Sequence, residues 1–63
     1  MNTIYTVHGR TYDSWKSSLA ETQGHYFDAL GRNDAYMVEK WGAEEARIQN
    51  IIDHWDILKV EQQ

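Results

Sequence analysis

The sequence predicts an all-α fold: an antiparallel helical hairpin with a short extended arm at its N-terminal end. Three observations support this prediction. Apolar residues recur at helical spacing over most of the chain, and proline is absent from all 63 residues. The segment Leu30–Asp34 joins a helix stop directly to a helix start. A chain of this length allows one domain, which we assign to residues 1–63.

Residues 1–11 are expected to form the extended arm. Ile4, Tyr5 and Val7 belong to residue types that favour an extended backbone, and Gly9 lies in a turn-like segment. Because no second strand is predicted, this arm can lie over a helix, fold back as a small hairpin or pair with another chain. We expect it to lie over the C-terminal part of the second helix.

Residues 12–30 are predicted to form the first helix. Its apolar side chains follow one another in helical steps, at Tyr12, Trp15, Leu19, Tyr26, Phe27 and Leu30. Thr11 or Asp13 can cap the start of this helix. Gly31 is placed to end it as a C′ glycine in the left-handed conformation.

A turn at residues 31–33 leads into a second helix over residues 34–60, capped by Asn33 or Asp34. The apolar stripe of this helix comprises Met37, Val38, Trp41, Ile48, Ile51, Ile52, Trp55 and Leu58. At 1.5 Å per residue the second helix would be about 40 Å long and the first about 28 Å. The apolar end of the second helix would then extend beyond the first and need the arm as cover.

The stripe on the second helix is wider than one neighbouring helix can bury. Two hairpins are therefore expected to form a four-helix arrangement, or a larger protein is expected to cover the surface. The expected interaction surface comprises Trp15, Leu19, Trp41, Ile48, Ile52 and Trp55. The predicted function is that of a small non-enzymatic protein–protein interaction factor, a regulator that forms a homodimer.

Catalytic, cofactor and metal chemistry are not expected. The sequence has no cysteine, so it offers neither a disulfide nor a cysteine-based zinc site, and it lacks the His-x-x-x-His spacing of helical zinc ligands. It has no glycine-rich phosphate loop. A hairpin this small has little room to enclose a substrate pocket. We therefore predict no catalytic, cofactor-binding or metal-binding residue.

Two alternatives involve nucleic acid, although the formal net charge of −4 disfavours a basic nucleic-acid-binding face. The second helix carries acidic side chains at Glu39, Glu44, Glu45, Asp53, Asp56 and Glu61. Such a row could imitate phosphates and inhibit a partner at its nucleic-acid site. The short turn could instead belong to a DNA-binding regulator, but the second helix begins with few base-reading side chains.

No membrane-spanning segment and no signal peptide are predicted, because the chain has no long apolar run. Together with the absence of cysteine, this favours a cytoplasmic protein.

By its size, its lack of cysteine and proline and its Leu30–Asp34 helix break, the whole chain resembles the small early proteins of temperate lambdoid phages, the 63-residue type of the exo–xis region. This resemblance implies a small helical factor that is made early in infection. It also implies that the factor modulates a host or phage protein in the host cytoplasm. It implies no catalytic residues.

Overall fold

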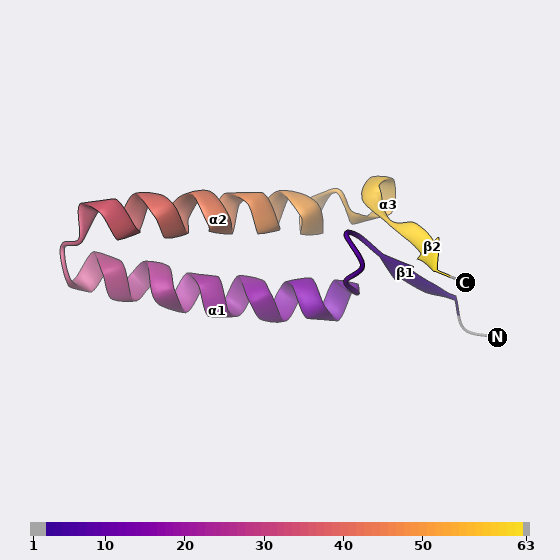
Figure 1. Ribbon diagram of the computed structural model, residues 1–63, viewed down its shortest axis with the longest axis horizontal. Coiled ribbons are helices and arrows are strands. Elements are labelled where there is room, and N and C mark those ends of the chain that lie inside the picture. Colours follow the sequence, from indigo (N-terminus) through magenta and orange to yellow (C-terminus); the bar gives the residue numbers. More distant parts are fainter. Residues whose placement is uncertain (1–2, 63) are drawn as a thin grey trace.

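The computed structural model describes residues 3–62 and shows two long helices lying side by side, with a small sheet at the end opposite their connection (Figure 1). In chain order the elements are β1 (Ile4–Thr6), α1 (Tyr12–Gly31), α2 (Ala35–Asp53), α3 (Trp55–Leu58) and β2 (Val60–Gln62). The predicted helical hairpin is confirmed. The all-α class is too narrow, because the two terminal strands pair with each other.

α1 begins and ends through local hydrogen bonds. The backbone N–H of Ser14 donates to Thr11 Oγ1 at 3.3 Å, so Thr11, one of the two predicted candidates, is the cap. At the other end, the N–H groups of Asn33 and Asp34 donate to the carbonyls of Leu30 and Ala29 at 3.2 and 3.1 Å. This is the Schellman arrangement that satisfies the last carbonyls of a helix.

The residue that takes the left-handed conformation after α1 is Asn33, with φ of 56°, and not Gly31. Gly31 still belongs to the helix, so its predicted role as the C′ glycine is wrong. Asparagine tolerates the left-handed region better than most side chains. Asp34 follows and caps α2 by accepting the N–H of Met37 at 3.2 Å, so of the two predicted caps, Asn33 and Asp34, it is Asp34 that is used.

The second helix is shorter than predicted. α2 ends at Asp53, His54 leaves helical geometry with φ of −110° and ψ of 25°, and α3 adds one more turn before the chain extends at Lys59. The predicted single helix over residues 34–60 is therefore wrong over its last seven residues, where a break at His54, one separate helical turn and an extended segment replace it. The last residues instead form β2, which satisfies the backbone groups of β1 in a way that a continued helix would not.

β1 and β2 are antiparallel, with Ile4 opposite Gln62, Tyr5 opposite Glu61 and Thr6 opposite Val60. The N-terminal segment is therefore a paired strand, and the premise that the sequence offers it no partner strand is wrong.

A tight turn at His8 and Gly9 connects β1 to α1. Both residues have positive φ, 52° and 76°, as in the type I′ turns of β-hairpins. The flanking residues exchange two backbone hydrogen bonds: Val7 N–H donates to Arg10 O at 2.9 Å, and Arg10 N–H donates to Val7 O at 3.1 Å. This turn reverses the chain and delivers Val7 to the core.

The core lies at the sheet end of the hairpin. Val7, Trp15, Ile48 and Ile51 are buried together, and Leu19, Ile52 and Trp55 pack against them. Val7 of the N-terminal arm therefore covers the C-terminal part of the second helix, as expected, whereas Ile4 remains 54% exposed. Among residues 3–62, no helix combines the length and the apolar character needed to cross a membrane.

Candidate interaction surface

The six residues predicted for the interaction surface lie mostly in the interior of the single chain. Trp15 and Ile48 are buried, and Leu19, Ile52 and Trp55 pack against the same core. Trp41 lies apart from them, half-buried, with its ring stacked on His25 at a centroid distance of 4.5 Å and an interplanar angle of 17°. The structure therefore brings five of the six together, but inside the hairpin.

A first exposed apolar area lies where the two long helices meet the turn. Phe27 is 65% exposed and Leu30 is 44% exposed. They lie three residues apart on α1, so they project from neighbouring positions of one helix side. Phe27 is also about 200° around α1 from the buried Ala29. Phe27 fits the helical spacing of apolar residues in the sequence, but that spacing alone does not show that its side chain points to solvent.

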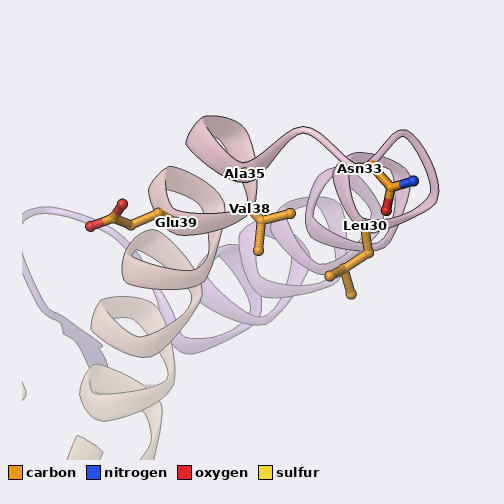
Figure 2. Close-up of a pocket in the computed structure, with 5 residues that line it drawn as sticks. All are labelled: Leu30, Asn33, Ala35, Val38 and Glu39. Atoms are coloured by element: carbon orange, nitrogen blue, oxygen red, sulfur yellow. The ribbon is translucent and has the colours of Figure 1, made fainter.

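Leu30 also lines an open hollow of about 320 Å³. It is lined by Leu30, Asn33, Ala35, Val38 and Glu39. Figure 2 shows the carbon side chains of Leu30 and Val38 between the ends of α1 and α2, with the carboxylate of Glu39 turned outward. We call Phe27, Leu30, Ala35 and Val38 the turn-end patch.

A second exposed apolar area lies at the sheet. Val60 is 65% exposed, Ile4 is 54% exposed and Ile57, in the turn of α3, is 80% exposed. Ile4 and Val60 project from the same face of the sheet, because Val60 pairs with Thr6 and alternate residues of a strand share a face. We call Ile4, Ile57 and Val60 the sheet-end patch.

The opposite flank of α1 is polar and bonded to itself. Arg10 donates from Nε to Ser14 Oγ at 3.0 Å and from Nη2 to the carbonyl of Ser14 at 3.0 Å. The same guanidinium reaches Ser18 Oγ. Further along this flank, Arg32 pairs with Asp28 at 3.2 Å. These groups leave little apolar surface on this side.

The acidic row of the second helix is interrupted by local pairs. Glu44 accepts from Arg47 at 2.5 Å, and this hydrogen bond raises the pKa of the Arg47 guanidinium. Asp56 pairs with Lys59 at 3.2 Å. A phosphate-like row needs largely unpaired carboxylates, so these bonds weaken the resemblance to nucleic acid.

The histidine and carboxylate side chains are dispersed. His25 Nε2 lies 4.0 Å from a Glu21 oxygen on the surface of α1. Nowhere in residues 3–62 do three or more histidine, aspartate or glutamate side chains form a group that could hold a metal ion. The two apolar patches are therefore the features of the described surface that can bind a partner, and they would do so by apolar contact.

Comparisons with protein-family models, with curated proteins and with solved structures find no match for this chain.

Proposed function

We propose that this chain is a small non-enzymatic protein–protein interaction factor that self-associates as two hairpins in a four-helix arrangement and regulates a further protein. The exposed apolar side chains of the two patches carry the proposal, above all Phe27 at 65%, Val60 at 65% and Ile57 at 80% exposure. Fully burying such a side chain contributes about 1.5–3 kcal/mol. Contiguous exposed apolar surface on a small protein marks a site of association.

The two patches lie at opposite ends of a molecule whose longest extent is 48 Å. One patch can therefore be occupied while the other remains accessible, so that self-association and binding of a regulated protein are compatible. The resemblance to small early phage proteins adds that the regulated protein belongs to the host or to the phage, in the cytoplasm.

Affinity capture from cells of the source organism tests this function, with the tagged wild-type chain and the variant Ile57→Asp compared side by side. We expect one protein to be recovered with the wild-type chain and to be strongly depleted with the variant. Apolar contact should persist when salt rises from about 0.1 M to about 1 M, because the Debye length falls from about 10 Å to about 3 Å and affects mainly charge pairs.

A nucleic-acid-binding protein that is recovered at low salt and released at moderate salt would favour the acidic inhibitor instead. Equal recovery with the wild-type chain, with Ile57→Asp and with an untagged control would contradict the proposed function.

A further inference from the structure

We infer that a second copy of this chain docks on the flank of the hairpin that carries the turn-end patch, with both turns at the same end of the dimer. In this arrangement α1 of each copy lies over α2 of the other, and Phe27 of each copy enters the hollow of the other. The inference rests on the proposed self-association and specifies its face and its orientation.

The docking flank runs the length of the hairpin. The turn-end hollow includes Leu30 and Val38, and a second hollow at the other end includes Tyr12 and Ile52. Tyr12 and Leu30 are 18 residues apart, which is five full turns of an α-helix, so they lie on the same side of α1. The opposite flank is the polar one that carries Arg10, Ser14 and the Asp28–Arg32 pair.

Contacts between the helices show which residues lie at equal height. His25 stacks on Trp41, and Tyr12 meets the Trp55 ring at 5.3 Å, so residue numbers at equal height add up to about 66 or 67. Phe27 therefore lies at the height of residues 39–40 of α2, which is also about the height of Val38 and Glu39 in the lining of the hollow.

A two-fold axis parallel to the helices keeps each residue at its height and sets α1 of each copy against α2 of the other. It therefore places Phe27 of each copy over the apolar turn-end hollow of the other. An axis across the helices would carry Phe27 toward the far end instead, where the hollow is lined by the carboxylates of Asp53 and Asp56. Both carboxylates are exposed and hydrogen-bonded, Asp53 to Gln49 and Asp56 to Lys59. Covering them with an aromatic ring would remove their water, which is unfavourable, so the same-end arrangement is preferred.

Charge on the flank agrees with this orientation. Lys16 extends along the same side of α1, with Nζ 5.6 Å from the centre of the Tyr12 ring. By the height relation it faces residues 50–51 of the other copy, about one helical turn or less from Asp53. A positive group on α1 thus meets a negative group on α2, and rim charges of this kind set orientation and register more than affinity.

The exposed area also fits a dimer. The chain exposes 4842 Å², whereas a globular monomer of 7.4 kDa exposes about 4,200 Å² by the usual scaling with mass. The excess of roughly 600 Å² approaches the ~800 Å² that each partner buries in a standard interface.

Sedimentation equilibrium tests the face, with the wild-type chain, Phe27→Glu and the matched control Tyr36→Glu. Tyr36 is even more exposed than Phe27, at 73%, but lies about 200° around α2 from Val38 and so off the docking flank. We expect a wild-type dimer, at least about 30-fold weaker dimerisation for Phe27→Glu and a change within about 3-fold for Tyr36→Glu. Circular dichroism confirms that each variant is folded.

A distance measurement tests the orientation. The chain has no cysteine, so Arg32→Cys in the turn carries the only spin label in each copy. Turns at the same end place the two labels within about two helix diameters, roughly 20–25 Å, whereas turns at opposite ends separate them by more than about 30 Å.

Two results would overturn the docking inference and leave the proposed function standing: a wild-type dimer that Phe27→Glu does not weaken, or a dimer whose turn labels lie at opposite ends. A wild-type chain that stays monomeric at high concentration would overturn both the docking inference and the proposed self-association. The capture experiment with Ile57→Asp would then still decide whether another protein is bound.

Discussion

Trp15 joins the N-terminal segment to the helical hairpin, so replacing it tests how the two parts are held together. The side chain is 4% exposed, and its ring packs with Ile48 and Ile51. Its Nε1–H donates to Val7 O at 3.0 Å. The guanidinium of Arg10 lies over the ring, 4.3 Å from its centre. Trp15→Phe retains an aromatic ring but removes the donor.

Two losses add up in Trp15→Phe. Val7 O keeps the bond from Arg10 N–H, so losing the indole bond costs about 1 kcal/mol and leaves no unpaired carbonyl. The smaller ring leaves roughly 50 Å² of apolar surface unfilled, which costs about 1 kcal/mol at 25 cal/mol/Å². We therefore expect the free energy of unfolding to fall by about 2 kcal/mol. Trp15→Ala should cost about 3–5 kcal/mol, close to the whole stability of a small domain.

Urea unfolding followed by far-ultraviolet circular dichroism measures these losses. Trp41→Phe is the matched control, because Trp41 is half-buried against His25 and its replacement removes ring area without breaking a link to Val7. We expect the control to lose about 1 kcal/mol or less. The reasoning is refuted if Trp15→Phe loses less than about 0.5 kcal/mol, or no more than the control does.

Four further predictions concern the ends of the elements. Asp34→Ala removes the side chain that accepts the Met37 N–H and should lower the free energy of unfolding by about 1 kcal/mol, measured by thermal denaturation; an unchanged midpoint would contradict the cap. Gly31→Ala should raise stability by up to about 1 kcal/mol, because Gly31 is helical and a Cβ there meets nothing within 4 Å. Asn33→Ala should lower the free energy of unfolding by about 1 kcal/mol, because φ is 56° at this residue. If urea titrations show that Gly31→Ala and Asn33→Ala are both stabilised, the left-handed residue lies elsewhere. Deleting residues 60–63 should leave the helical circular dichroism signal nearly intact but remove the cross-strand nuclear Overhauser effects of β1, and persistence of those effects would contradict the pairing.

The parts of the fold that depend on neighbouring residues could be predicted. The spacing of apolar residues placed α1 to within one residue, and short polar side chains narrowed each helix start to two candidate caps, of which Thr11 and Asp34 are the ones used. Such signals act over one or two turns of the chain, where hydrogen bonds link residues three or four apart. The helical hairpin followed from them.

The exposed surface could be predicted only in part. Helical spacing marked Phe27 and Leu30 as apolar positions of the first helix, but their direction depends on where α2 lies against α1. Once the helices pack, the Ala29 side becomes the interior and Phe27 points to solvent. The six expected surface residues became mainly core for the same reason.

The amino-acid sequence alone determined the helical hairpin, its caps and its supply of apolar side chains, because each depends on local spacing and short-range hydrogen bonds. The tertiary structure decided that the chain leaves the helix at His54 and pairs β2 with β1. Trp55 and Leu58 fit the helical pattern of the sequence, yet residues 60–62 pair with a strand more than 50 positions away in the chain. Pairing between such distant residues offsets the free-energy cost of ending a helix only after the two ends of the chain have come together. The local sequence pattern therefore does not predict it.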